Sequence, residues 1–246
     1  MNSLAGPMAI VAALAPLLPP LAHTADVDAA IVFAVDVSAS IDPATADLQR
    51  EGHAAAISSP EVVAAITGNR TGCIAVAYVE WASSGDARSV VPWTSVCGLG
   101  DAQAVASVIR REGDRGFGCE RRCATSISFA IDVGCMLLDN YVGSVSRKII
   151  DISANGTNND GLPVAGSRLR AIAKGYTINA IAIPEVILGQ VYDFTAYFAD
   201  NVIGGPRAFV IALSSTGDYA AALRRKLVTE ISLSIRSSRN EMTAHE

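Results

Sequence analysis

Three short segments of the sequence carry oxygen-bearing side chains that could bind a metal ion together. The first segment holds Asp36, Ser38 and Ser40 at alternate positions, while Thr125 and Asn155 belong to the other two. Carboxylate, hydroxyl and carboxamide oxygens suit a hard divalent cation. We therefore predict a site for Mg²⁺, or for Mn²⁺ or Ca²⁺, formed by these five residues.

The elements around these segments explain how they could meet. A continuous apolar run over 29–35 ends at Asp36, and a strand-like run over 148–153 ends just before Asn155. Such continuous runs are typical of strands buried on both faces of a parallel sheet. Thr125 stands at the start of a strongly apolar helical segment. Because ligand sites form beyond the carboxyl ends of parallel strands, we expect the three segments to share that edge.

Strands and helices alternate along the rest of the chain. This order predicts an α/β fold with a doubly wound, mostly parallel central sheet, one antiparallel edge strand, and helices on both faces. The turn 83–86 lies between two strand-like runs and indicates the hairpin that supplies the antiparallel strand. We expect strands over 29–35, 71–81, 87–96, 148–153, 176–183 and 208–213, and helices over 44–58, 60–66, 101–111, 125–141, 163–174, 192–202 and 219–235.

The segments around the predicted metal site resemble a known protein family. Residues 35–40 read VDVSAS, which is similar to the metal-ion-dependent adhesion site of von Willebrand factor A domains, Asp-x-Ser-x-Ser after the first strand. Thr125 matches a Thr that the family adds from a later loop, and residues 149–156 resemble its fourth strand and following Asp-Gly turn. The resemblance spans about residues 29–236 and looks closest to an uncharacterised group of exported bacterial proteins.

The resemblance implies a Rossmann-like fold and a defined binding chemistry. Asp36, Ser38, Ser40 and Thr125 would hold a Mg²⁺ ion directly or through water, and an Asp or Glu of a protein partner would complete its coordination. Asn155 departs from the pattern, because the family usually has Asp there. Asp36 is then the one carboxylate at the matched positions, unless Asp151 or Asp160 takes part, so we expect weaker metal affinity.

Each candidate ligand also has a purely structural interpretation. Asp36 could cap the turn after its strand, with the two serines bonding the backbone. Thr125 could be a helix N-cap, and Asn155 a turn residue before Gly156. The polar residues of 158–160 are interpreted as loop residues rather than ligands.

The N-terminal region predicts export. Residues 1–24 contain an apolar, charge-free run followed by small residues, as in a secretory signal peptide, although the usual Lys or Arg at its start is missing. An uncleaved membrane anchor is the alternative. We expect a single domain over 25–236 in the periplasm or secreted, with no membrane span after cleavage, and a disordered tail over 237–246.

The five cysteines fit an oxidising compartment. Cys119 and Cys123 lie close together in a polar loop, and Cys73 and Cys97 flank the predicted hairpin, so both are candidate disulfide pairs. Cys135 lies in an apolar helix pattern and is expected to be a buried, free thiol.

Composition and missing motifs argue against two classes of function. The net charge is −5 and no basic block of five or six residues occurs, so nucleic-acid binding has little support. The short basic clusters, including residues 224–226, are interpreted as solvated surface. No phosphate-binding glycine loop or nucleophile elbow is present, and His53 alone lies within the predicted domain, so we expect no enzyme.

The sequence thus favours an exported, metal-dependent protein-binding domain. The alternatives are a metal-free structural or scaffolding domain whose site has decayed, and a metal-dependent hydrolase.

Overall fold

A mostly parallel sheet forms the centre of the molecule. The computed structural model describes residues 26–116, 123–213 and 216–243. Within these ranges the main sheet has six strands in the order β3-β2-β1-β4-β5-β8, and only the β2–β3 pair is antiparallel. Its strands are β1 (Val27–Asp36), β2 (Ile74–Trp81), β3 (Ala87–Val96), β4 (Val145–Ala154), β5 (Thr177–Ala182) and β8 (Val210–Ala212).

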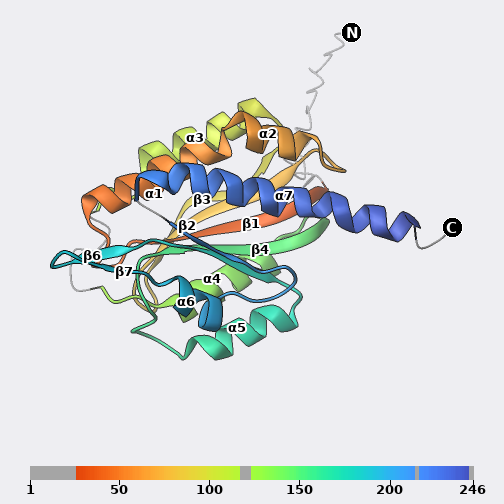
Figure 1. Cartoon of the computed structure of the whole chain (residues 1–246). Helices are drawn as coiled ribbons and strands as arrows, with labels where there is room; N and C mark the ends of the chain where they lie inside the picture. The colour runs from red at the N-terminus through yellow and green to blue at the C-terminus, as the bar shows by residue number, and fades with distance from the viewer. Residues whose placement is uncertain (1–25, 117–122, 214–215, 244–246) are drawn as a thin grey trace, which may run out of the picture.

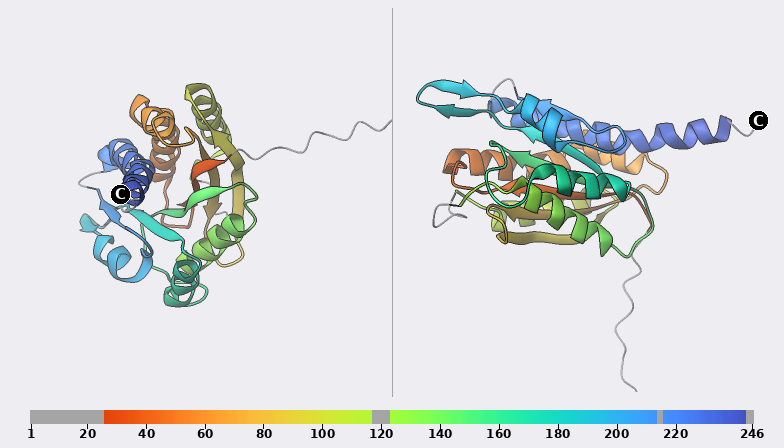
Figure 2. Two further views of the ribbon diagram at one scale, coloured as in Figure 1. Left: turned by 90° about the vertical axis from the view of Figure 1, so that its right-hand side faces the viewer. Right: turned by 90° about the horizontal axis from the view of Figure 1, so that it is seen from below.

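Helices cover both faces of this sheet (Figures 1 and 2). One face carries α1 (Pro43–Ile57), α2 (Pro60–Thr67), α3 (Leu99–Glu112) and α7 (Tyr219–Thr243). The other face carries α4 (Ile127–Asp139), α5 (Val164–Ala173), α6 (Thr195–Tyr197) and the short π-helix η1 (Phe198–Val202). The predicted doubly wound α/β fold is therefore confirmed.

Strand β1 runs through the middle of the core. All ten of its residues are buried, because neighbouring strands flank it and helices cover both of its faces. Successive side chains of a strand point to opposite faces. Phe33 accordingly packs with the α1 and α7 side, and Val32 packs with the α4 and α5 side.

A buried ionic network joins β4, β5 and α7. Lys226 Nζ lies 2.5 Å from Asp151 Oδ1 and 2.5 Å from Glu230 Oε1, and all three side chains are buried. Asn179 Nδ2 donates to the same Glu230 oxygen at 2.6 Å. Burial opposes the charge of Lys226, but the two carboxylates more than offset this and raise its pKa. Interpreting residues 224–226 as solvated surface was therefore wrong for Lys226.

Two other predicted elements differ in part. The predicted helix over 192–202 begins later, because Tyr192 ends a hairpin of β6 (Glu185–Ile187) with β7 (Gln190–Tyr192), and the helical residues are those of α6 and η1. The hairpin turn places Leu188 at φ 51° and Gly189 at φ 80°, and a leucine gives no turn signal. Helix α7 continues to Thr243, so residues 237–243 of the predicted disordered tail are helical; no Gly or Pro interrupts them.

The cysteines follow the predicted pattern where the structure describes them. Cys73 and Cys97 form a disulfide that ties the start of β2 to the end of β3, and Cys135 is free and buried. Cys123 is disulfide-bonded, while Cys119 lies outside the described residues. The predicted signal peptide over 1–24 also lies outside them. None of the helices in the described ranges is long and apolar enough to cross a membrane.

Candidate metal centre

The topology brings the three predicted segments to one edge of the sheet. Asp36 is the last residue of β1, Asn155 directly follows β4, and these two strands are neighbours in register. Thr125 lies just before α4, in a loop held to the end of β2 by the bond from Ser126 N to Ala82 O at 2.9 Å. The chain leaves β1 toward α1 on one face, whereas α4 enters β4 from the other. This change of direction opens the crevice in which doubly wound sheets bind ligands.

Four of the predicted residues form a continuous row of oxygen contacts. Thr125 Oγ1 donates to Ser38 Oγ at 3.0 Å, and Ser38 Oγ lies 3.3 Å from Ser40 Oγ. Ser40 Oγ in turn donates to Asn155 Oδ1 at 2.7 Å. Ser38, Thr125 and Asn155 are buried and Ser40 is half-buried. All of the predicted residues except Asp36 are thus linked directly through side-chain oxygens.

Asp36 adds a carboxylate with an unused oxygen. Oδ1 accepts from the Ser38 backbone N–H at 2.8 Å, but Oδ2 is buried and has no hydrogen-bond partner within the described part of the chain. Burial raises the pKa of the Asp36 carboxyl to about 7, although hydrogen bonds from Ser38 and from the Asn155 backbone lower it. A buried carboxylate oxygen without a partner is costly. A bound cation would satisfy it, so the residues fit a metal ion.

Local hydrogen bonds shape the loop that carries the two serines. Ile41 N donates to Ser38 O at 2.9 Å and closes a turn. Asp42 then caps helix α1 by accepting from Thr45 N at 2.7 Å, with Pro43 at the first helical position. The sequence between β1 and α1 is therefore a fixed turn that points Ser38 inward and leaves Ala39 exposed.

Gln49 supports the site from α1, and the sequence reading missed it. Its Nε2 donates to the Asp36 carbonyl oxygen at 2.9 Å, and its Oε1 accepts from Ser153 Oγ at 2.7 Å. Ser153 also lies 2.7 Å from the hydroxyl of Tyr219 on α7. The sequence does indicate that Gln49 is buried, because it lies on the same helical face as Ala46 and His53, which are also buried.

The loop after β4 positions Thr125. Asn159 Oδ1 accepts from Thr125 N at 2.8 Å, and Asn158 Oδ1 accepts from Ser128 N at 2.9 Å. Gly161 has φ 75°, and a Cβ there would lie 2.5 Å from Ser126 Oγ, so the close approach of the two loops requires glycine. The asparagines are therefore loop residues, as predicted, but they also fix a candidate ligand.

The two alternative carboxylates do not reach the centre. Asp151 lies within β4, faces α7 and pairs with Lys226. Asp160 Oδ2 accepts from Ser84 N at 2.6 Å. Thr125 is not a helix N-cap: that position belongs to Ser126, and the Thr125 hydroxyl bonds to Ser38 instead. Asn155 is more than a turn residue, since its Nδ2 also donates to Ser40 O at 3.1 Å.

A cavity of about 420 Å³ opens beside Ser40 and Asn155. It extends along the start of α1 to the segment after β5. Asp42 and Glu185 supply acidic groups to its wall, and its lining contains no basic residue. Burial raises the pKa of Glu185. The space next to the candidate centre is therefore suited to a group of neutral or positive charge.

Comparison with known proteins places the chain in a family. The family described as "Protein of unknown function (DUF1194)" matches residues 26–235. The chain belongs to this family. No curated protein sequence matches this DUF1194 chain significantly.

Solved structures share the fold of the DUF1194 chain at low sequence identity. BatB from Bacteroides thetaiotaomicron is 16% identical, with 82% of this chain and 98% of that chain covered and a TM-score of 0.56. The SpRpn10 VWA domain is 9% identical, with 78% of this chain and 93% of that chain covered and a TM-score of 0.51.

A third similar structure is a matrix protein with a metal site. Proximal thread matrix protein 1 from the mussel byssus, with a zinc-occupied MIDAS motif, is 16% identical, with a TM-score of 0.55. The alignment covers 82% of the DUF1194 chain but only 48% of the mussel chain. The fold of the DUF1194 chain is therefore of the von Willebrand A type.

Proposed function

We propose that this DUF1194 chain is an exported protein-interaction domain whose sheet edge holds a divalent cation. The observation that supports this proposal most directly is the buried, unpartnered Asp36 Oδ2 beside the hydroxyls of Ser38, Ser40 and Thr125. The ion best suited to these oxygens is Mg²⁺, with Mn²⁺ or Ca²⁺ as substitutes. The zinc-occupied motif of the mussel matrix protein supports the idea that this fold can hold a divalent cation at such a motif.

Each residue has a distinct part in the proposed centre. Asp36 supplies the negative charge, and the three hydroxyls supply neutral oxygens on one side of the ion. Asn155 holds Ser40 in place through two hydrogen bonds and is a further candidate ligand through Oδ1. A divalent ion with one protein carboxylate keeps excess positive charge, which favours an Asp or Glu of a protein partner as the incoming ligand.

The neighbouring cavity adds a preference for that partner. Asp42 and Glu185 line it without a basic residue. A partner that presents a carboxylate to the ion and a Lys or Arg next to it would match both charges, because opposite charges across an interface favour correct pairing. The partner class is therefore a protein with adjoining acidic and basic side chains.

Two other functions are less well supported. A decayed, purely structural site does not require an unpartnered buried carboxylate oxygen, and such an oxygen is disfavoured without a ligand. A metal-dependent hydrolase needs a general base that activates water. Around the centre the described residues offer one carboxylate, three hydroxyls and one carboxamide, and no histidine. Binding is thus a better use of these groups than hydrolysis.

Export is supported by the disulfides. The Cys73–Cys97 bond and the bonded Cys123 suit an oxidising compartment such as the periplasm or the outside of the cell. Cell fractionation of the tagged chain should find it outside the cytoplasm, with its cysteines oxidised. Recovery in the cytoplasm with reduced cysteines would contradict this part of the proposal.

The test measures metal binding before partner binding. Titration of the purified chain with Mg²⁺ by calorimetry should give one binding site, and Asp36→Ala should abolish it. Asp200→Ala is the matched control, because Asp200 is an exposed carboxylate on η1, which packs on the opposite face of the sheet from α1. Equal binding by wild type and Asp36→Ala would refute the metal centre.

Partner capture then tests the function itself. Chemical cross-linking in a native extract with Mg²⁺ should retain proteins on wild type and Asp200→Ala but not on Asp36→Ala. Excess EDTA should release them. The same proteins on all three variants, with or without EDTA, would leave no role for a metal bridge. Hydrolysis of a generic phosphate ester only when Mg²⁺ is present would instead favour the hydrolase.

A further inference from the structure

An exposed hairpin lies at the same edge of the sheet as the candidate metal centre. Strands β6 and β7 pair with each other in a two-stranded sheet that is separate from the main one. They follow β5, whose carboxyl end is in register with that of β4. The hairpin projects beyond the start of α1 (Figures 1 and 2). It therefore extends the surface that surrounds the metal centre.

The tip and the second strand of this hairpin are exposed and apolar. Leu188 is 100% exposed, Val191 is 68% exposed and Tyr192 is 43% exposed. The segment 186–192 contains no charged residue. Single exposed apolar side chains are common on protein surfaces, whereas apolar side chains gathered on one projecting element are typical of a binding surface.

The turn at the tip is unfavourable for the leucine that occupies it. Leu188 and Gly189 have φ values of 51° and 80°, so both central residues of this two-residue turn lie in the left-handed region. Such turns favour Asn followed by Gly, because the Cβ of most residues is strained there. The stability of the hairpin alone would favour Asn at position 188. A strained leucine with its whole side chain in solvent points to a contact outside the chain.

The base of the hairpin lines the cavity of about 420 Å³ beside the metal centre. Pro184 and Glu185 contribute to its wall, together with Ser40 and Asn155 from the centre itself. Leu188 lies three residues beyond Glu185, which is roughly 10 Å along an extended strand. A protein bound at the centre can therefore reach the tip of the hairpin.

We propose that the β6–β7 hairpin is the apolar half of the partner-binding surface, and that Leu188 inserts into an apolar recess of the protein whose carboxylate binds the metal ion. This inference rests on the proposed metal-dependent binding function. The partner is then a protein that presents an apolar recess beside adjoining acidic and basic side chains.

The charges around the hairpin favour a protein over a membrane surface. Glu185 and Asp193 flank the uncharged segment, and Asp42 lies in the wall of the adjoining cavity. Anionic lipids attract basic segments and repel acidic ones. A basic side chain of a protein partner instead complements these carboxylates.

The experiment first places a photoreactive amino acid at the tip of the hairpin. p-Benzoylphenylalanine replaces Leu188 in the full chain, and in a control chain it replaces Leu169, an exposed leucine on α5. Irradiation in a native extract with Mg²⁺ should join a protein to position 188 but not to position 169, and EDTA should prevent the reaction. Mass spectrometry identifies the joined protein, which is then purified.

Calorimetric titration with this purified protein measures what Leu188 contributes. In Mg²⁺, Leu188→Asn should weaken binding about tenfold to a hundredfold, as expected when a leucine side chain is no longer buried. Leu169→Gln should leave the affinity unchanged. Thermal unfolding of Leu188→Asn should occur at no lower temperature than that of wild type, because Asn is favoured in the left-handed turn. The loss of affinity is then not a loss of fold.

The outcomes distinguish the hairpin from the metal centre. Equal affinity of wild type and Leu188→Asn, with loss of binding in Asp36→Ala, overturns the role of the hairpin and leaves the metal bridge in place. Loss of binding in Leu188→Asn, with wild-type affinity in Asp36→Ala, keeps the hairpin as a docking element and refutes the metal bridge.

Three further outcomes overturn the proposed occupant. The first is that no protein is joined at position 188. The second is that two copies of this chain are joined there, which would mean self-association. The third is co-sedimentation with vesicles of phosphatidylcholine and phosphatidylglycerol that Leu188→Asn abolishes, which would mean that the hairpin binds a lipid surface.

Discussion

Asn155 and Ser40 are joined by two hydrogen bonds, with Asn155 Oδ1 accepting from the Ser40 hydroxyl and Asn155 Nδ2 donating to the Ser40 carbonyl oxygen. A carboxamide can do both, whereas a carboxylate can only accept. Asn155, which stands where the resemblance to von Willebrand factor A domains predicts Asp, therefore has a defined structural role. It fixes the last serine of the Asp-x-Ser-x-Ser segment against the end of β4.

Replacing Asn155 by Asp should have opposite effects on metal affinity and on the metal-free fold. The new carboxylate adds charge beside Asp36 and should tighten Mg²⁺ binding, as measured by calorimetry. It also removes the donor to Ser40 and places two carboxylates together, so unfolding in EDTA should become easier by about 1–3 kcal/mol. Equal or weaker Mg²⁺ binding by Asn155→Asp would contradict the assignment of this position to the centre.

Asp36→Asn should remove the effect of metal without harming the metal-free protein. Asn keeps an acceptor for the Ser38 N–H but removes the buried charge of Oδ2. In wild type, Mg²⁺ at about 100 times its Kd should stabilise the fold by about 2.7 kcal/mol. Thermal unfolding should show this gain in wild type only. In EDTA, the unfolding midpoint of Asp36→Asn should be no lower than that of wild type. A metal-dependent shift that survives in Asp36→Asn would place the ion elsewhere.

Lys226→Met should be strongly destabilising. It would leave Asp151 and Glu230 buried without their cation, and breaking a buried ion pair in this way typically costs about 3–5 kcal/mol. Arg111→Met breaks the exposed pair with Glu112 and should cost less than about 1 kcal/mol. Urea unfolding measures both. Similar stability of the two variants would mean that the network contributes little.

His53 should make the fold sensitive to acid. It is buried between Phe33, Tyr78 and Tyr219, and burial lowers its pKa from 6.5 to about 4. The unfolded chain therefore binds a proton more readily than the folded chain below pH 6.5. The contribution of His53 to the free energy of unfolding should fall as the pH drops from about 6.5 to 4, by roughly 3 kcal/mol in total.

The matched variant for this prediction is His53→Phe. Phe preserves an aromatic ring in the pocket but cannot take up a proton. The difference in unfolding free energy between wild type and His53→Phe should shift in favour of the variant as the pH falls through this window. A difference that stays constant from pH 7 to pH 4 would exclude His53 as the acid-sensitive group.

The candidate ligands could be predicted because each one is marked by a local pattern. Asp36 and Asn155 follow apolar runs that must be buried strands, and strand direction in a parallel sheet then places their ends together. Thr125 stands at the start of an apolar helical segment, and the resemblance to von Willebrand factor A domains matches it to their Thr. The structure confirms that all five residues lie at one edge, whereas metal binding itself stays a prediction.

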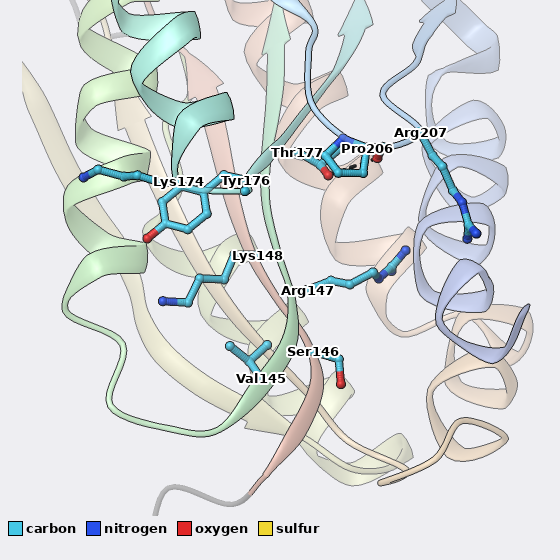
Figure 3. Close-up of a pocket in the computed structure, with 10 residues that line it drawn as sticks. Val145, Ser146, Arg147, Lys148, Lys174, Tyr176, Thr177, Pro206 and Arg207 are labelled. Atoms are coloured by element: carbon cyan, nitrogen blue, oxygen red, sulfur yellow. Dashed lines mark hydrogen bonds between the residues drawn. The ribbon is translucent and has the colours of Figure 1, made fainter. Parts of the chain in front are cut away.

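The bonding partners of the supporting residues could not be predicted, because these partners are distant in sequence. The helical face of Gln49 indicates that it is buried, but only the approach of β1 and Ser153 reveals that both ends of its amide are bound. Lys226 sits in a basic cluster that resembles a surface, but its partner Asp151 is distant in sequence. Four cations, Arg147, Lys148, Lys174 and Arg207, line a cavity where β4 and β5 begin (Figure 3). They come from β4, the end of α5 and the segment before β8, so no sequence window contains them.

Strand β4 connects the candidate metal centre to the opposite end of the sheet. Its last residue, Ala154, lies next to Asn155, and its first, Val145, pairs with Val27 at the start of β1. Ten residues at about 3.3 Å each separate the two ends by roughly 30 Å. A partner bound at the metal centre would therefore lie roughly 30 Å from the point at which β1 begins.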